Sequence, residues 1–293
     1  MALLTHAQVA CFREQGFVTA PGAVTATQLD ALREDFARWV ELSREHDAPF
    51  GEMLDGRPRF DVEPGHSREA PALRRVASPT ELSGNYLAVL TDSPMLEMIA
   101  QLIGPDLRFH HSKLNSKLPG TATRVEWHQD FTFDPHTNDD MVTALVFLDE
   151  VTDDNGPLKV VPGSHRGPLL SLRQQGRFTG AVDAATAVAL ERDAVPATGP
   201  AGAACLMHVR TAHASSPNRS SRARTLFIAG IAAADALPLA PNAVPSIHEG
   251  RLLRGREPNR IRSVAFEMEM PEVPEGASFF HQQASGRPGA GRG

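Results

Sequence analysis

The sequence has few cysteines, no long apolar run and no excess of positive charge. Cys11 and Cys205 are its two cysteines, too few for a disulfide framework, and no CxxC or Cys/His cluster indicates structural zinc. No window is apolar over the length of a membrane-spanning helix, and the N-terminus lacks a signal-peptide pattern. The net charge of −6 gives no basic field for nucleic acid or anionic lipid. We therefore expect a cytoplasmic protein with neither kind of partner.

The composition is that of a soluble globular protein, with 41% hydrophobic and 22% charged residues. A chain of 293 residues is long enough for one large domain or two ordinary ones. No stretch within residues 1–282 has the character of a linker, so we predict a single domain there. Residues 283–293 are rich in Gly, Arg and Pro without large apolar side chains, which predicts a disordered tail.

The N-terminal third is predicted to be mostly helical. Thr5 is placed to cap a short helix that Gly16 ends. From Thr27, apolar residues recur at steps of three and four, which predicts an amphipathic helix of about four turns. A third helix is expected over 93–104, where Ser-Pro precedes the apolar run and Gly follows it. Residues 47–80 are rich in Pro, Gly and charge and are predicted to be a long loop.

After residue 104 the pattern changes to short strands separated by turns. The expected strands are 107–117, 123–128, 141–149, 158–161, 203–209 and 224–232, with a short helix over 183–192. Many strands after a helical start predict a mainly β fold. The expected architecture is a double-stranded β-helix, the jelly-roll or cupin-like fold, with the N-terminal helices packed on one sheet.

The segment Trp127-His128-Gln129-Asp130 predicts a metal site. Residues two apart on a strand point to the same side, so His128 and Asp130 can share one metal ion. A distant second His completes a facial triad of two His and one carboxylate, the arrangement of non-heme Fe(II) oxygenases. His213 is the candidate, and His208 lies five residues before it. His208 falls within or just after a predicted strand, where a hydrogen-bonded structural histidine is the commoner outcome.

An arginine eleven residues after His213 is suited to binding a carboxylate in the open half of such a site. The planar guanidinium of Arg224 can donate two parallel charge-assisted hydrogen bonds. Arg222 lies on the same strand face and competes for this role. Arg224 leads directly into the apolar run 226–228, which favours it.

Three motifs in this order resemble the phytanoyl-CoA dioxygenase (PhyH-like) family of Fe(II)/2-oxoglutarate-dependent oxygenases. They are the Trp-His-Gln-Asp segment at 127–130, Asn-Gly-Pro-Leu at 155–158 with Pro-Gly-Ser-His at 162–165, and the His-x-Ser-x-x-Asn run at 213–218 that leads to Arg224. The residues that follow His213 in this run favour it over His208 as the second imidazole ligand.

The resemblance implies a role for each matching residue. His128, Asp130 and His213 match the iron ligands, and Arg224 matches the arginine that pairs with the distal carboxylate of 2-oxoglutarate. Two further matches are Lys117, near the cosubstrate, and Ser215, in the His-x-Ser motif. Related halogenases have a small residue in place of the carboxylate ligand, so the Asp at position 130 favours hydroxylation.

The implied activity is hydroxylation of a C–H bond of a small metabolite. Fe(II) is the cofactor, 2-oxoglutarate and O2 are cosubstrates, and succinate and CO2 are formed. Desaturation, epoxidation and ring formation use the same centre and remain open, because the outcome depends on fine substrate placement. A rival from another class is a catalytically silent jelly-roll protein that binds a metal or ligand; the intact triad and Arg224 argue against it.

The loop after the triad carboxylate offers candidate substrate contacts. Phe131, Phe133 and His136 follow Asp130 and would lie over the metal. Ordinary packing of the two Phe side chains within the loop is the alternative interpretation.

Overall fold

The computed structural model describes residues 3–54 and 56–272; the predicted tail, 283–293, lies outside this range. The helices are α1 (His6–Gln15), α2 (Ala26–Ser43), α3 (Pro79–Leu82), α4 (Gly84–Thr91), α5 (Pro94–Ile103) and α6 (Ala184–Asp193), with short 3-10 turns η1 (Asp130–Thr132) and η2 (Ser164–Arg166). In the part of the chain that is described, no helix is both long and apolar enough to cross a bilayer.

Most strands belong to one large antiparallel sheet with the order β1-β12-β7-β14-β5-β4-β3-β2, in which β15 also pairs with β5. Its strands are β1 (Phe17–Ala20), β2 (Phe50–Leu54), β3 (Arg57–Val62), β4 (Leu73–Ala77), β5 (Leu107–Lys117), β7 (Met141–Phe147), β12 (Ala204–His208), β14 (Arg224–Ala233) and β15 (Leu252–Arg254). The prediction of a mainly β fold is confirmed.

A smaller antiparallel sheet has the order β11-β8-β13-β6. Its strands are β6 (Val125–His128), β8 (Leu158–Val160), β11 (Val195–Ala197) and β13 (His213–Ser215), and a separate hairpin joins β9 (Arg173–Gln174) to β10 (Arg177–Phe178). Leu145 and Ile228 of the large sheet share a buried apolar cluster with Leu158 and Val160 of the small sheet. The two sheets therefore pack face to face.

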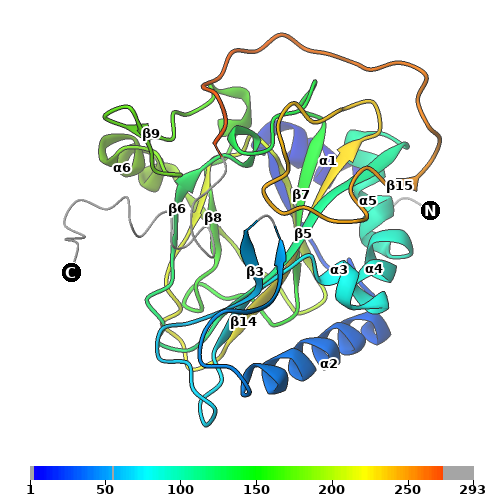
Figure 1. The fold of residues 1–293 in the computed structure, drawn as a ribbon. Helices are drawn as coiled ribbons and strands as arrows, with labels where there is room; N and C mark the ends of the chain where they lie inside the picture. Colours follow the sequence, from blue (N-terminus) through cyan, green and yellow to red (C-terminus); the bar gives the residue numbers. More distant parts are fainter. Residues whose placement is uncertain (1–2, 55, 273–293) are drawn as a thin grey trace.

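The N-terminal helices cover the other face of the large sheet (Figure 1). Alternate residues of β14 separate the two faces: Phe227 packs with Leu32 of α2 and Tyr86 of α4, while Leu226 and Ile228 face the small sheet. The ring of Phe227 meets that of Tyr86 edge-on at 4.9 Å. The expected placement of helices on one sheet is confirmed.

The predicted helix ends are close to those observed. Thr5 and Gln8 form a reciprocal capping box at the start of α1, and Gly16 ends the helix with a left-handed φ of 83°. A second capping box at Thr25 starts α2 two residues before the predicted Thr27. The helix predicted over 93–104 is present as α5.

The prediction of a loop over 47–80 was wrong, since this segment forms β2, β3, β4 and the start of α3. These strands carry buried charges in place of alternating apolar residues. Arg74 of β4 donates to Asp61 of β3 at 2.8 Å and to Glu63 at 3.3 Å, so an ion-pair network holds the strands where the usual apolar pattern is missing. These strands extend the sheet beyond β5 and bring Arg75 to its inner face.

We predict that Phe227→Ala destabilises the fold by about 3–5 kcal/mol, because it opens a cavity between β14 and α4. Chemical denaturation monitored by circular dichroism measures this change. Val188→Ala is the matched control: Val188 is 57% exposed on α6 and its truncation is expected to change stability by about 0.5 kcal/mol or less. Equal effects of the two substitutions would contradict the packing described for the helical layer.

Candidate active site

A cavity of about 80 Å³ lies between the two sheets. Polar and apolar side chains both line it: Arg75, Lys113, Asn115, Lys117, Val125, His128, Asp130, Leu145, Leu158, His213, Ser215, Arg224, Leu226 and Ile228. The small sheet supplies His128 from β6 and His213 from β13, while the large sheet supplies the lysines from β5 and Arg224 from β14.

The structure brings together the three residues predicted to bind metal. His128 ends β6 and is the direct cross-strand partner of His213 at the start of β13. Asp130 begins the turn η1, and its Oδ1 lies 3.5 Å from His128 Nε2 and 3.6 Å from His213 Nε2. One potential ligand atom from each residue falls within 4.8 Å of the others. A single ion can contact all three.

The imidazoles are oriented so that Nε2 faces the shared point. Nδ1 of His128 lies 2.8 Å from the carbonyl of Glu126, and Nδ1 of His213 lies 2.9 Å from the carbonyl of Thr211. Because a carbonyl only accepts, Nδ1 carries the proton in each ring and Nε2 is left with a lone pair. This is the outer-shell arrangement that orients a metal-binding histidine. The donor set therefore fits a divalent ion such as Fe(II).

The protonation states also suit metal binding. Burial, with His128 nearby, lowers the pKa of His213 to about 4, so its imidazole is neutral at pH 7. Burial opposes ionisation of Asp130, but His213, His128 and Lys113 outweigh it and hold its pKa well below the usual range. Thr143 of β7 donates to the second carboxylate oxygen at 2.6 Å. Asp130 is thus an ionised, oriented carboxylate that could bind a metal.

A second part of the cavity is cationic. Arg224 is 2% exposed, donates to the carbonyl of Gly156, and lies directly across the ladder from Lys117. Lys117 donates to Ser215 Oγ at 2.7 Å and to the carbonyl of Ser216. Burial lowers the pKa of Arg224 to about 10, which leaves it charged at pH 7. Burial and the nearby Arg224 set the pKa of Lys117 well below its ordinary value. The structure thus brings Arg224, Lys117 and Ser215 together.

Gly156 allows this close approach. A Cβ at this position would lie 2.7 Å from the carbonyl oxygen of Ser216 and 3.1 Å from Lys117 Cδ, and the φ of 79° is unfavourable for other residues. The Asn-Gly-Pro turn is therefore part of the cationic wall.

The structure distinguishes the residues that compete for the same role in the sequence. Arg222 is exposed and pairs with Glu150 at 3.2 Å on the surface, so it does not reach the cavity. His208 is also outside the cavity; its ring packs near Phe12 and His165. The geometry favours Arg224 over Arg222 and His213 over His208.

The three residues predicted to contact the substrate do not all reach the site. Phe133 lines a smaller cavity of about 60 Å³ beside the triad and meets the His128 ring at 5.7 Å. Phe131 points elsewhere, into an apolar cluster where its ring packs on Phe266. His136 is buried against His110 and lines neither this cavity nor the one that holds the triad. Of the three, the structure brings Phe133 alone to the site.

The smaller cavity has cationic residues that sequence reasoning missed. Arg57, Arg75 and Lys113 line it together with His128 and Asp130. Lys113 could have been found from the strand period, because Lys113 and Lys117 share one face of the strand predicted over 107–117. The arginines lie on strands in the segment predicted to be a loop.

His110, His111 and Asp134 form a second group of possible ligands, and His111 and Asp134 line this cavity. His110 Nε2 is 3.2 Å from Asp134 Oδ1. Burial opposes charge on both, yet their pairing raises the pKa of His110 and lowers that of Asp134 to about 2. His110 and Asp134 therefore form a buried pair in which each favours the charged form of the other.

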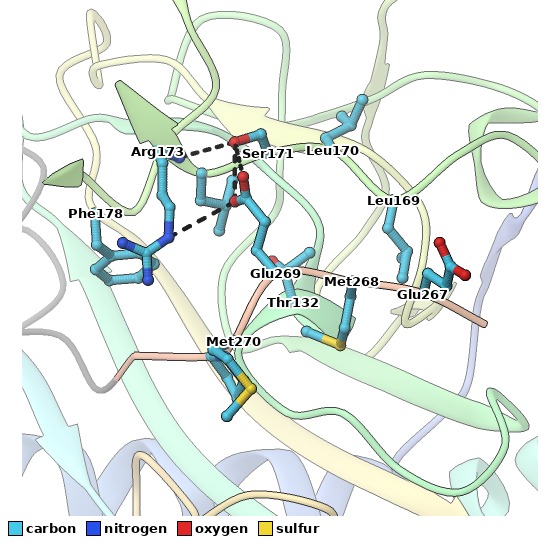
Figure 2. Close-up of a pocket in the computed structure, with 12 residues that line it drawn as sticks. Thr132, Leu169, Leu170, Ser171, Arg173, Phe178, Glu267, Met268, Glu269 and Met270 are labelled. Atoms are coloured by element: carbon cyan, nitrogen blue, oxygen red, sulfur yellow. Dashed lines mark hydrogen bonds and ion pairs between the residues drawn. The ribbon is translucent and has the colours of Figure 1, made fainter. Parts of the chain in front are cut away.

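Two larger cavities lie away from the triad. The extended segment that follows β15, drawn in orange in Figure 1, lines both of them. Figure 2 shows residues 267–270 facing Leu169, Leu170 and Phe178 across a cavity of about 390 Å³. Ser171 donates to both carboxylate oxygens of Glu269 at 2.9 Å. The Phe178 ring lies 5.8 Å from that of Phe133, so Phe133 stands between this outer space and His128.

Comparison with known proteins decides the family. The model of the phytanoyl-CoA dioxygenase (PhyH) family matches residues 12–226. The chain belongs to the phytanoyl-CoA dioxygenase family. A probable alpha-ketoglutarate-dependent hypophosphite dioxygenase of Stutzerimonas stutzeri is 34% identical over 89% of this chain and 90% of that protein. The ectoine dioxygenase of Halomonas elongata is 29% identical over 76% of this chain and 68% of that protein.

Solved structures agree with the fold. EctD from S. alaskensis, crystallised with 2-oxoglutarate and 5-hydroxyectoine, aligns with a TM-score of 0.65 at 22% identity, covering 90% of this chain and 88% of that one. A carbocyclase from nogalamycin biosynthesis aligns with a TM-score of 0.61 at 23% identity, covering 80% and 85%. The double-stranded β-helix prediction is confirmed.

This member of the phytanoyl-CoA dioxygenase family is a non-heme iron dioxygenase that uses 2-oxoglutarate and O2 and acts on a small molecule. The sequence-based predictions of its class and of its cofactor and cosubstrates are confirmed. The relatives set aside the alternative of a catalytically silent binding protein, because they are named as dioxygenases.

Proposed function

We propose that His128, Asp130 and His213 bind the catalytic Fe(II), and that Arg224, with Lys117 and Ser215, binds the distal carboxylate of 2-oxoglutarate. The observation that carries this proposal is the convergence of one ligand atom from each triad residue within 4.8 Å. Support for the cosubstrate site comes from the burial of Arg224, whose Nε lacks a hydrogen-bond partner among the described residues.

Each residue has a defined task in this assignment. The carbonyls of Glu126 and Thr211 hold the two imidazoles with Nε2 forward, and Thr143 orients the Asp130 carboxylate. Arg224 offers a planar donor to one end of the cosubstrate, which fixes its position relative to the triad. Bound iron supplies O2 activation coupled to decarboxylation of 2-oxoglutarate.

The apolar walls have a separate task. Leu145, Leu158, Leu226 and Ile228 line the cavity around the polar groups. They exclude water, which strengthens the charge-assisted hydrogen bonds to the cosubstrate and protects the reacting centre.

The overall reaction is hydroxylation of a small molecule. Substrate R–H, O2 and 2-oxoglutarate give R–OH, succinate and CO2, so one oxygen atom enters the product and the other enters succinate. The relatives' names supply an assay panel: hypophosphite, L-proline and ectoine. Proline and ectoine would be hydroxylated at carbon, the expected C–H reaction, and hypophosphite at a P–H bond. Succinate release above the substrate-free rate, with Fe(II) present, tests the activity.

We predict that His128→Ala, Asp130→Ala and His213→Ala each abolish iron binding and turnover without unfolding the protein, because the triad lies at strand ends. Iron content measured after anaerobic loading, together with succinate release, checks this. His208→Ala is the matched control and is expected to retain iron. A triad variant that keeps as much iron and activity as His208→Ala would remove that residue from the ligand set.

We predict that Arg224→Ala raises the KM for 2-oxoglutarate by about 30-fold or more, because a buried charge-assisted contact contributes on the order of 2–5 kcal/mol. Iron content is expected to stay near the wild-type level. Arg222→Ala, which removes an exposed arginine two residues away, is expected to have little effect. The assignment fails if Arg222→Ala has the larger effect on this KM.

A further inference from the structure

Two cations beside the triad lack partners that the fold could provide. Arg75 of β4 is 6% exposed, and Lys113 of β5 is partly buried. Among residues 3–54 and 56–272, neither side chain forms a hydrogen bond or an ion pair. Arg74, the neighbour of Arg75, shows the usual arrangement of a buried arginine, since it is paired with Asp61 and Glu63. Arg75 and Lys113 are therefore exceptions that need an explanation.

The acidic groups around these two cations are already engaged. Asp61, which faces Arg75 across the β3–β4 ladder, accepts two hydrogen bonds from Arg74. Asp134 is paired with His110 at 3.2 Å. Asp130 lies between two imidazoles and is assigned to iron. Asp61 attracts Arg75 and Asp130 attracts Lys113 through space, but neither carboxylate forms a hydrogen bond or an ion pair with these cations.

Burying a cation without a counter-charge costs several kcal/mol, so such a group persists where a bound anion or water compensates it. Burial, with repulsion from Arg57, lowers the pKa of Arg75 to about 10, so it stays charged at pH 7. Arg57, which donates to the carbonyl of Ala243, lines the same cavity and adds to the positive potential. The positive charge of these side chains favours the binding of an anion in this cavity.

The geometry places this field next to the reacting centre. Arg75 is the cross-strand partner of Asn115, and Lys113 is two residues along β5 on the same face. Arg75 and Lys113 are thus diagonal neighbours, roughly 7–8 Å apart across the ladder, and side chains of this length can both reach one small oxyanion. Both line a space of about 60 Å³ together with His128 and Asp130, and both also border the adjoining cavity of about 80 Å³ that is assigned to 2-oxoglutarate.

The pair formed by Arg75 and Lys113 is distinct from the pair formed by Arg224 and Lys117, which is assigned to the cosubstrate. Lys117, which lies opposite Arg224, is four residues from Lys113, or roughly 13 Å along the strand. The two cation pairs therefore lie at different places along β5, and His128, Asp130, Arg75 and Lys113 line both cavities.

We propose that Arg75 and Lys113 bind the primary substrate, and that this substrate is a small oxyanion whose anionic group lies between them. This inference rests on the proposed function, because assigning Arg224 and Lys117 to the cosubstrate leaves Arg75 and Lys113 for the substrate. It narrows the panel of relatives' substrates to those that present an anionic group without a neighbouring positive charge. Hypophosphite meets this condition, whereas L-proline and ectoine carry both charges.

The test combines binding and turnover of four oxyanions and two zwitterions. Hypophosphite, phosphite, methylphosphonate, acetate, L-proline and ectoine are each supplied to the iron-loaded enzyme with 2-oxoglutarate and O2, and succinate and oxidised product are measured. Separately, the Kd for 2-oxoglutarate is measured anaerobically from the visible charge-transfer absorption of the iron complex. We expect one or more of the oxyanions to stimulate succinate formation and to be oxidised.

The variants are Arg75→Gln and Lys113→Gln, with Arg75→Lys and Lys113→Arg as conservative replacements. We expect each Gln variant to raise the KM for the oxyanion by about 30-fold or more, and the conservative variants to recover part of the loss. The Kd for 2-oxoglutarate is expected to change by less than about 3-fold. Lys159→Gln, which removes a surface lysine paired with Glu191, is the control and should match the wild type.

The outcomes separate this inference from the proposed function. A wild-type enzyme that binds iron and 2-oxoglutarate but oxidises the zwitterions alone would overturn the inference and leave the proposed function standing. A rise in the Kd for 2-oxoglutarate without a change in substrate KM would also overturn it, because the two cations would then serve the cosubstrate. Failure of the wild type to bind 2-oxoglutarate with iron would overturn the proposed function itself.

Discussion

The proposed metal site depends on one buried carboxylate, Asp130, which lies between the imidazoles of His128 and His213. Burial opposes the ionisation of Asp130, but the neighbouring His213, His128 and Lys113 favour the charged form and lower its pKa. The small sheet supplies both imidazoles, and Thr143 of the large sheet donates to the carboxylate. The triad therefore exists only when the two sheets pack face to face. The helical layer behind β14 supports the site indirectly, by completing the core of the large sheet.

Around this centre the large sheet presents positive charge at two places along β5. Lys117 is paired with Ser215 and lies across from Arg224, while Lys113 lies near Arg75. In the proposed assignment, a cosubstrate with two carboxylates binds at the first place, and the second place is left for the substrate. An iron site with two cation pairs is suited to two anionic reactants, which would be oriented by charge before any reaction occurs.

The motifs around the triad could be read from the sequence because their chemistry depends on local spacing. His128 ends β6, the strand predicted over 123–128, and Asp130, two residues on, begins the turn η1. The same period could have revealed Lys113 from Lys117. Arg57 and Arg75 could not be found in this way. Their strands are stabilised by ion pairs such as Arg74 with Asp61, so the apolar alternation that normally indicates a strand is absent.

Long-range packing explains the remaining differences. Phe131 and Phe133 are equivalent in the sequence, but Phe131 packs on Phe266 and Phe133 lies over His128. The position of Phe131 depends on its contact with Phe266, which is more than a hundred residues away in the sequence. Arg222 and Arg224 differ in the same manner, because Glu150 pairs with Arg222 on the surface while the turn at Gly156 receives Arg224.

A crystal structure of the anaerobic complex with Fe(II), 2-oxoglutarate and hypophosphite would test the central assignment most directly. We predict a metal bound to Nε2 of His128, Nε2 of His213 and the Asp130 carboxylate, with the distal carboxylate of 2-oxoglutarate on Arg224. The oxyanion should lie between Arg75 and Lys113. Metal bound instead at His110, His111 and Asp134, or 2-oxoglutarate bound to Arg75 and Lys113, would contradict the assignment.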